Sequence, residues 1–290
     1  RRIIRTIKLM NYRNIINIGT TILKKNAILT ANMDAELLLS IAINKTREKI
    51  LLNLEDELSL KEESLYLDLV NRRKIKEPIS YIRGKKFFWK YDFVVNKNVL
   101  TPRFETELLI EEVLKLYKNT DNIRVLDIGL GSGCILISLL KEKKRWKGVG
   151  IDVSELAINV AKTNAKIQQV RNRIKFINSD IDKFNSYKYD LIVSNPPYIN
   201  KIGYNNLDLG VKNYEPIKAL YGGVDGLRII EKIIGKSKFI LKNNGILVME
   251  IGLGQHQKVS EQLKKSGFYV FKTVKDYQKI KRLIFAKKIK

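Results

Sequence analysis

The alternation of short apolar runs with amphipathic segments after residue 100 most constrains how this 290-residue chain can fold. The runs are rich in β-branched residues and predict strands, and the segments between them repeat their apolar residues at helical spacing. We expect strands at 124–128, 147–152, 173–178, 189–194, 245–251, 267–272 and 280–286, and helices at 104–117, 133–143, 155–167, 226–241 and 255–265. This pattern predicts an α/β fold with a doubly wound, seven-stranded, mostly parallel sheet covered on both faces.

The sequence changes character near residue 85. Apolar residues recur at helical spacing between residues 20 and 77, with Asn32 as a possible helix cap, and we expect Pro78 to end this helical region. The aromatic and β-branched stretch 87–95 predicts a β-hairpin. We therefore expect a small N-terminal helical domain over residues 1–85, a hairpin linker over 86–100 and an α/β domain over 101–290.

Composition narrows the class of protein. No apolar run approaches the roughly 20 residues that cross a bilayer. The numbered sequence begins with Arg1 rather than Met, which leaves open whether this is the true start, and it shows no signal-peptide core, so we expect a cytoplasmic protein. Cys134 is the only cysteine and His256 the only histidine, which excludes a disulfide framework and argues against a zinc site. We expect no metal, a buried Cys134 and a solvated, non-catalytic His256.

The formal net charge of +25 has two interpretations. A basic surface attracts nucleic acid or a nucleoprotein. The basic excess is spread along the chain, however, and the joint abundance of Lys, Ile and Asn is equally typical of a general compositional bias. Charge alone therefore does not choose the substrate.

A glycine-rich turn follows the first strand predicted for the α/β domain, with the sequence Asp127-Ile128-Gly129-Leu130-Gly131-Ser132-Gly133. Glycines at alternate positions let a ligand lie against the backbone near a helix N-terminus, which favours a carboxylate. The spacing differs from that of dinucleotide dehydrogenases, and no Lys-Ser/Thr of a phosphate loop follows, which argues against NAD and ATP. The alternative is a tight turn whose glycines serve packing alone.

Acidic residues follow the next two predicted strands. Asp152 ends the second strand, where its two carboxylate oxygens can accept hydrogen bonds from both hydroxyls of a ribose. Its alternative role is to cap the helix that opens near Ser154. Asp180 and Ile181 follow the third strand, where the carboxylate can accept from an adenine amino group and the aliphatic side chain can cover the ring.

The sequence Asn195-Pro196-Pro197-Tyr198 follows the buried run 191–194. A proline pair cannot continue a hydrogen-bonded ladder, so the chain must leave the sheet at a strand end where open α/β sheets bind ligands. The Asn195 side-chain carbonyl and the Pro196 main-chain carbonyl can each accept one N–H of a planar nitrogen and align it with a methyl donor. Pro197 stiffens the turn and Tyr198 can pack on the amide plane, although Asn-Pro also begins ordinary turns.

Together these residues resemble the S-adenosylmethionine-dependent methyltransferases, and specifically the HemK/PrmC family of peptide chain release factor glutamine methyltransferases. The resemblance covers nearly the entire chain. It departs from the family pattern at Ile181, where better-known members carry tryptophan, and at Phe104, where proline is more frequent. It rests on motifs in the family's order: Glu77-Pro78-Ile79-Ser80-Tyr81-Ile82-Arg83-Gly84, Thr101-Pro102-Arg103-Phe104-Glu105-Thr106-Glu107, Asn195-Pro196-Pro197-Tyr198, Glu215-Pro216 and Gly222-Gly223-Val224-Asp225-Gly226-Leu227.

The resemblance implies methyl transfer from S-adenosyl-L-methionine, giving S-adenosyl-L-homocysteine, to the glutamine of the Gly-Gly-Gln motif of release factors. It implies that residues 195–198 bind the target and that residues 129–133, Asp152, Ile181 and Asn195 hold the cofactor. The helical domain would bind the protein substrate, with no membrane involved and no direct nucleic-acid binding required.

Two points about the chemistry stay open at the level of sequence. No general base is expected, because a methylated amide nitrogen is acidic enough to lose its proton to water. Arg103 and Glu107 either orient the target or close the pocket, or they form a salt bridge at a helix terminus. The rival function is a DNA or ribosomal RNA amino-methyltransferase that acts on an exocyclic base nitrogen with the same kind of turn.

Overall fold

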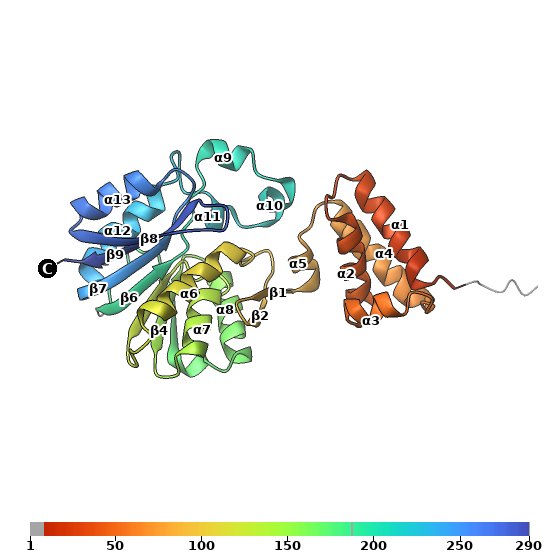
Figure 1. Cartoon of the computed structure of the whole chain (residues 1–290), viewed down its shortest axis with the longest axis horizontal. Helices are drawn as coiled ribbons and strands as arrows, with labels where there is room; N and C mark the ends of the chain where they lie inside the picture. The colour runs from red at the N-terminus through yellow and green to blue at the C-terminus, as the bar shows by residue number, and fades with distance from the viewer. Residues whose placement is uncertain (1–8, 187, 290) are drawn as a thin grey trace, which may run out of the picture. The chain divides into compact units, whose positions relative to one another are not determined.

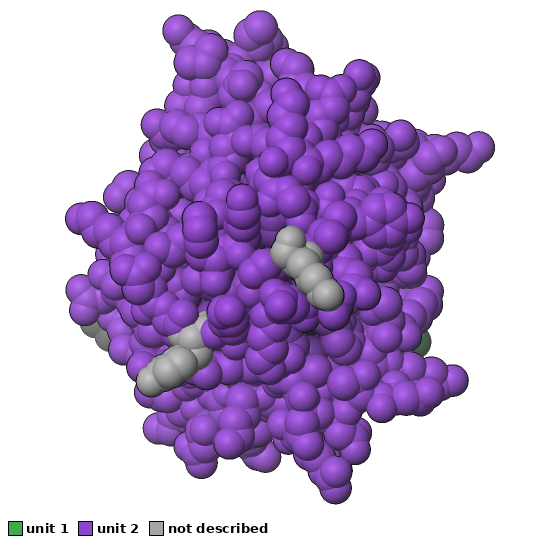
Figure 2. Space-filling model, turned by 90° about the vertical axis from the view of Figure 1, so that its left-hand side faces the viewer, with its two compact units in different colours: residues 1–83, 209–214 green, residues 84–208, 215–290 purple. Residues whose placement is uncertain are grey.

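The computed structural model describes residues 9–186 and 188–289, so residues 1–8, with which the numbered sequence begins, lie outside it. The chain divides into two compact units (Figure 2). Unit 1 comprises residues 1–83 and 209–214, and unit 2 comprises residues 84–208 and 215–290. No helix in the described part of the chain is both long and apolar enough to span a membrane.

Unit 1 is helical. Its core is made by one face of each longer helix and includes the fully buried Ile15, Leu38 and Tyr66. A capping box begins the fourth helix, because the Ser59 side chain accepts from Glu62 N while the Glu62 carboxylate accepts from Ser59 N. The helices are α1 (Tyr12–Lys25), α2 (Ala31–Ala42), α3 (Arg47–Leu52), α4 (Leu60–Lys74), α5 (Ile79–Arg83) and the later α10 (Leu209–Tyr214).

Two local predictions in unit 1 are wrong. Asn32 lies inside α2 and donates its side-chain N–H to Glu36 Oε1 at 2.8 Å, while Thr30 occupies the N-cap position. Pro78 does not end the helical region, because α5 begins at the next residue. A proline is tolerated at a helix start, where its missing N–H has no intrahelical partner to lose, and its carbonyl accepts the N–H groups of Tyr81 and Ile82.

Unit 2 is built on a sheet that, in the described chain, has seven strands in the order β5-β4-β3-β6-β7-β9-β8. Neighbours from β5 through β7 are parallel, and β9 runs antiparallel to both β7 and β8. The predicted doubly wound, mostly parallel sheet is confirmed. Its strands are β3 (Arg124–Ile128), β4 (Lys147–Asp152), β5 (Ile174–Asn178), β6 (Tyr189–Ser194), β7 (Leu241–Glu250), β8 (Phe268–Lys275) and β9 (Lys281–Lys288).

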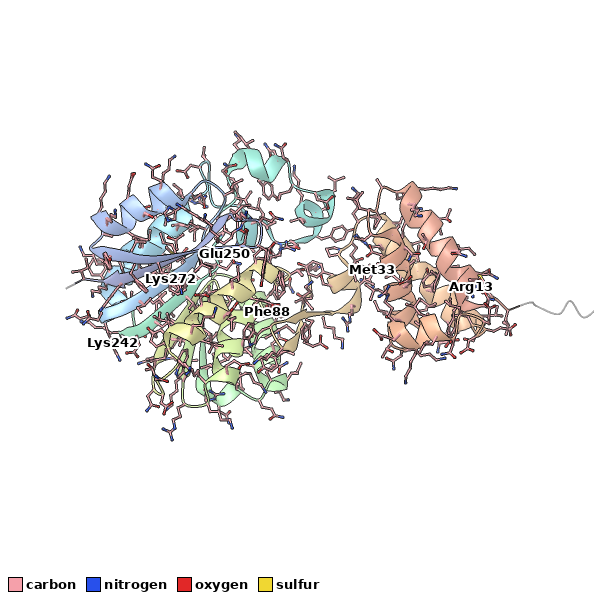
Figure 3. The ribbon with its side chains drawn as sticks, in the orientation of Figure 1. Arg13, Met33, Phe88, Lys242, Glu250 and Lys272 are labelled. Carbon is pink, nitrogen blue, oxygen red and sulfur yellow. The ribbon has the colours of Figure 1, made fainter. Side chains whose placement is uncertain are left out.

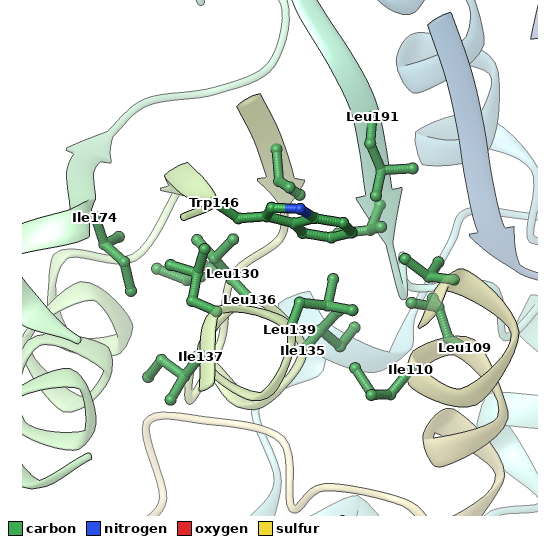
Figure 4. Packing of buried hydrophobic residues seen from close by; sticks show 14 of the residues in the cluster. Leu109, Ile110, Leu130, Ile135, Leu136, Ile137, Leu139, Trp146, Ile174 and Leu191 are labelled. Carbon is green, nitrogen blue, oxygen red and sulfur yellow. The ribbon is translucent and has the colours of Figure 1, made fainter. Parts of the chain in front are cut away.

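Helices cover both faces of this sheet (Figure 1). On one face the fully buried Trp146 lies among aliphatic side chains that include Leu136 and Leu139 (Figure 4). On the other face Ile230 and Ile234 pack against the sheet. The first face carries α6 (Glu107–Leu116), preceded by the 3-10 turn η1 (Phe104–Thr106), α7 (Cys134–Glu142) and α8 (Glu155–Ile167), which leads to η2 (Arg171–Arg173); the second carries α12 (Arg228–Ile240) and α13 (His256–Lys265). Burial of this kind contributes about 1.5–3 kcal/mol per large side chain and stabilises the sheet against its covering helices.

A β-hairpin precedes the sheet and groups with unit 2. Its strands, β1 (Lys85–Phe88) and β2 (Tyr91–Val94), are antiparallel. Asn164 of α8 is fully buried, and its side chain accepts from Val94 N at 2.7 Å while donating to Val94 O at 3.0 Å and Ser132 O at 2.9 Å. One amide therefore fastens the hairpin to the glycine-rich turn.

Two short helices of unit 2 were not predicted, α9 (Lys201–Asn205) and α11 (Ile217–Leu220). Each is too short to show a helical repeat in the sequence. They lie in the segment between β6 and α12, which returns to the sheet edge where β6 ends.

Candidate active site

A cavity of about 270 Å³ lies at the carboxyl ends of β5, β4, β3 and β6. The residues that were predicted to bind ligand follow four different strands. They meet in the lining of this cavity, as expected for an open α/β sheet. Gly133, Pro196 and Tyr198 are not part of the lining. The predicted residues in the lining are Gly129, Leu130, Gly131, Ser132, Asp152, Asp180, Ile181, Asn195 and Pro197.

The glycine-rich turn (residues 129–133) joins β3 to the N-terminus of α7. Gly129, Gly131 and Gly133 have φ values of +76°, +54° and +80°, in the left-handed region that favours glycine. The N–H groups of Gly129 and Leu130 both donate to Ile151 O, at 3.0 and 2.9 Å, and so fasten the turn to β4. At Gly133 a Cβ would lie 2.8 Å from a methyl carbon of Ile137, so packing also requires this glycine.

Asp152 ends β4 and faces the glycine-rich turn. Its Oδ2 accepts from Gly131 N and its Oδ1 from Ser154 N, both at 2.9 Å. Burial raises the pKa of this carboxyl, and the backbone N–H groups oppose that rise. Ser154, not Asp152, is the N-cap of α8. Each Asp152 oxygen keeps a further lone pair for a hydroxyl donor in the cavity.

Asp127 lies beneath the same turn and is 1% exposed. Its Oδ2 accepts from Leu136 N at 3.2 Å, and its Oδ1 has no hydrogen-bond partner among the described residues. Burial raises the pKa of Asp127 to about 8. The carboxyl is therefore predominantly protonated at neutral pH when the cavity holds no ligand.

The 195–198 turn is held by two later segments. Ile199 N donates to Leu220 O at 3.0 Å, and Gly222 N donates back to Ile199 O at 2.9 Å. The backbone of Gly222 packs so closely on the turn that a Cβ there would lie 2.4 Å from Pro197 O. The Gln255 side chain adds a donor to Tyr198 O at 2.9 Å. The turn is consequently fixed by backbone contacts and by the Gln255 side chain.

Hydrogen bonds link two half-buried residues of the turn, Asn195 and Tyr198, to the buried Thr106 and Glu250, and we call these four residues the buried network. Glu250 ends β7 and is 1% exposed, and Figure 3 labels it within unit 2. Its Oε2 accepts from Thr106 Oγ1 at 2.7 Å and its Oε1 from the Tyr198 hydroxyl at 3.1 Å. Asn195 Nδ2 donates to Thr106 Oγ1 at 3.0 Å. Burial raises the pKa of the Glu250 carboxyl and also that of the Tyr198 phenol.

Sequence reasoning missed Thr106 and Glu250. A signal for Glu250 was available, because it stands at the carboxyl end of a predicted strand just as Asp152 does. Thr106 offered no comparable signal, since its role depends on a partner 144 residues away.

Arg103 lies at the cavity, whereas Glu107 does not. Arg103 lines the cavity, and its Nη2 donates to Glu215 Oε2 at 2.7 Å. That partner is buried and distant in sequence, so the ion pair is not the helix-terminus bridge considered above. Glu107 accepts from Trp89 N at 2.9 Å and is not part of the cavity lining.

The single cysteine and histidine have different surroundings. Cys134 is half-buried and lines the cavity, so the expectation of a buried cysteine was wrong; as the first residue of α7 it lies where the glycine-rich turn opens. His256 begins α13 and is half-buried, with Nε2 2.9 Å from Thr273 Oγ1 and outside the cavity lining. Within residues 9–186 and 188–289, no group of three or more His, Cys, Asp or Glu side chains is placed to hold a metal ion.

The fold and this constellation define the class of protein. A doubly wound sheet brings a glycine-rich turn, an acid at the end of the neighbouring strand and an Asn-Pro-Pro-Tyr turn to one cavity. The protein is a methyltransferase that uses S-adenosylmethionine.

Comparison with known proteins identifies the family. The chain matches the PrmC N-terminal domain over residues 14–84 and the methyltransferase small domain over residues 104–209. It is 38% identical to "Release factor glutamine methyltransferase" of Caulobacter vibrioides, over 92% of each chain, and 38% identical to the protein of that name from Clostridium acetobutylicum, over 87% of this chain and 90% of the other. It is also 37% identical to "Bifunctional methyltransferase" of Rickettsia typhi, over 94% of this chain and 56% of the other. The chain belongs to the release factor glutamine methyltransferase family.

Proposed function

We propose that the protein transfers a methyl group from S-adenosyl-L-methionine to the side-chain amide nitrogen of the glutamine in the Gly-Gly-Gln motif of peptide chain release factors. One observation carries the proposal: Asn195 lines the same cavity as the glycine-rich turn and Asp152. A methyl donor bound to the turn and to the acid would lie beside an amide that can hold the acceptor. The names of the relatives supply the class of acceptor.

The residues of the cavity fit this cofactor. The Asp152 oxygens would accept from the two ribose hydroxyls, and Asp180 and Ile181 would border the adenine. The turn at the N-terminus of α7 would receive the carboxylate of the methionine part. Ile181 is 6% exposed, so it offers an apolar wall without aromatic stacking. When bound, the cofactor supplies an electrophilic methyl group on a positively charged sulfur.

Asn195 and Pro196 would orient the acceptor. A glutamine amide nitrogen is a poor nucleophile because its lone pair is delocalised into the carbonyl, so it must be held in line with the methyl group. Asn195 Oδ1 and Pro196 O would each accept one N–H of the target amide and stabilise the positive charge that develops on the nitrogen. Pro197 would limit movement of the turn. The proton would then leave to water without a dedicated base.

The rest of the chain fits a protein substrate. We assign release-factor binding to the helical part of the chain, which we place at residues 1–85, with the hairpin at 86–100 and catalysis at 101–290. The reaction requires no metal and no direct contact with nucleic acid. It takes place in the cytoplasm, where release factors act.

Labelled methyl transfer tests the proposal. Purified protein and S-adenosylmethionine with a radioactive methyl group are incubated separately with a release factor, with the same factor carrying Gln→Ala in its Gly-Gly-Gln motif, with DNA and with ribosomal RNA. We expect label on the unaltered release factor alone, at the glutamine identified by mass spectrometry of the loop peptide. Label that appears only on DNA or ribosomal RNA would establish the rival function instead.

A further inference from the structure

The carboxylate of Glu250 sets the direction of the hydrogen bonds in the buried network. Glu250 is 1% exposed and Thr106 is 2% exposed, so bulk water does not replace their partners. The two hydroxyl donors, Thr106 and Tyr198, and the charge of Arg282 favour the ionised form of Glu250 against the burial that raises its pKa, and in that form the carboxylate only accepts hydrogen bonds. Thr106 Oγ1 and the Tyr198 hydroxyl each approach a different oxygen of Glu250, so both hydroxyl hydrogens are directed toward the acid.

The direction of the Thr106 hydroxyl determines what Asn195 can present to it. A hydroxyl has a single hydrogen, and that of Thr106 points to Glu250. Only lone pairs of Thr106 Oγ1 then face Asn195, 3.0 Å away. The Asn195 amide must offer an N–H there, because its carbonyl oxygen would meet a second acceptor.

Fixing the Asn195 nitrogen toward Thr106 leaves its oxygen for the substrate. Were the amide turned over, an NH2 group would face the target nitrogen, which also carries only N–H groups, and the acceptor function would be lost. Two charged side chains act on the pKa of Glu250. Arg282 lowers it and so favours the ionised carboxylate, whereas Glu105 raises it. Arg282 is itself anchored to Asp276 at 2.8 Å.

We infer that Thr106 and Glu250 are positioning residues that hold the Asn195 side-chain amide in the single orientation able to accept a hydrogen bond from the target nitrogen. The inference rests on the proposed function for its catalytic consequence. Thr106 lines the cavity and Glu250 does not, and in the proposed reaction neither residue contacts the methyl group or the target nitrogen. Their effect passes through Asn195.

Variants of Thr106 test the inference. Thr106→Val keeps the shape and removes the hydroxyl, whereas Thr106→Ser keeps the hydroxyl. Thr106→Val leaves the Asn195 N–H without its acceptor, and an unpaired buried polar group changes an equilibrium about 5- to 100-fold. We therefore expect Thr106→Val to lower kcat for release-factor methylation by about that factor. The Kd for S-adenosylhomocysteine should stay within about threefold, and Thr106→Ser should recover most of kcat. Equal rates for the Val and Ser variants would overturn the inference.

Glu250→Gln supplies a second, independent measurement. Glutamine has the same shape but presents one acceptor and one donor to two hydroxyls that both donate. It should lower kcat in the wild-type background and add little in the Thr106→Val background, where the network is already cut. Fully additive losses would show that Glu250 acts elsewhere.

A readout without substrate separates this inference from the proposed function. The side-chain 15N resonance of Asn195 can be assigned by its loss in Asn195→Asp. Its N–H exchange with water should be slow in wild type and Thr106→Ser and several-fold faster in Thr106→Val. This comparison stands even where wild type fails to label a release factor, a result that would refute only the proposed function. Unchanged exchange in Thr106→Val would refute the orientation of Asn195.

Discussion

Replacing Gly222 by alanine should damage the 195–198 turn without touching the cavity. Gly222 is outside the cavity lining, but its added Cβ would lie 2.4 Å from Pro197 O and 2.7 Å from Gly226 O. Both atoms belong to backbone, so no side chain can swing away. Reaching the 3.0 Å below which real Cβ contacts are essentially absent requires a movement of 3.0 − 2.4 = 0.6 Å.

That movement bears on the chemistry through the backbone. Pro197 O is one residue from the proposed acceptor Pro196 O and two from Asn195. A displacement of about 1 Å in a reacting geometry costs on the order of 100-fold, so a shift somewhat smaller than that should lower kcat about 10- to 100-fold. Overpacking of this kind also costs about 1–3 kcal/mol of stability, which leaves a folded protein to assay.

Single-turnover methylation of a release factor measures the effect, with S-adenosylhomocysteine titration and urea unfolding on the same samples. The matched control is Gly235→Ala in α12, where nothing lies within 4 Å of the new Cβ. There alanine should leave the rate unchanged and stabilise the helix by up to about 1 kcal/mol. A folded Gly222→Ala protein that methylates within about twofold of wild type would refute the reasoning.

Three further predictions concern the cavity. Asn195→Ala should abolish transfer while the Kd for S-adenosylhomocysteine stays within about tenfold, because the residue acts on the acceptor; an equally large loss of binding by calorimetry would reassign it to the cofactor. Asp152→Asn should weaken S-adenosylhomocysteine binding about 10- to 100-fold, since a charged acceptor is lost, and an unchanged Kd would contradict its role at the ribose. Asp127 has a native pKa of about 8, above its unfolded value, so the native state holds the extra proton. Its contribution to stability is therefore full below about pH 4 and is lost as the pH rises through 8, by up to about 1.4 kcal/mol per pH unit. The unfolding free energy of cofactor-free wild type relative to Asp127→Asn should fall between pH 5.5 and 7.5, and a pH-independent difference in urea titrations would count against this account.

Much of unit 2 was predictable because its signals are local. The buried parallel strands are visible in the sequence as continuous apolar runs, as in 189–194. The glycine-rich turn and Asp152 follow such runs directly. Their convergence on one cavity then follows from the topology of a doubly wound sheet. The short helices α9 and α11 were not predicted, because four or five residues are too few to show a helical repeat of apolar residues.

Contacts between distant segments could not be predicted from the sequence. Arg103 and Glu215 were both singled out in motifs, yet nothing in either motif indicates that they pair with each other. Thr106 reads as an ordinary helix-start residue until β7 places Glu250 beside it. Polar pairing of this kind depends on the final packing, whereas strand and turn patterns are written into neighbouring residues.

Asn164 also bears on how this protein can be divided. A shortened chain that begins after the hairpin would leave both bonds to Val94 unmade, inside a buried site, at about 1–3 kcal/mol for each group left without a partner. The same side chain donates to Ser132 O in the glycine-rich turn. A displaced Asn164 would therefore also disturb a residue that lines the cavity. Any exchange of modules between relatives must therefore carry the hairpin along with the sheet.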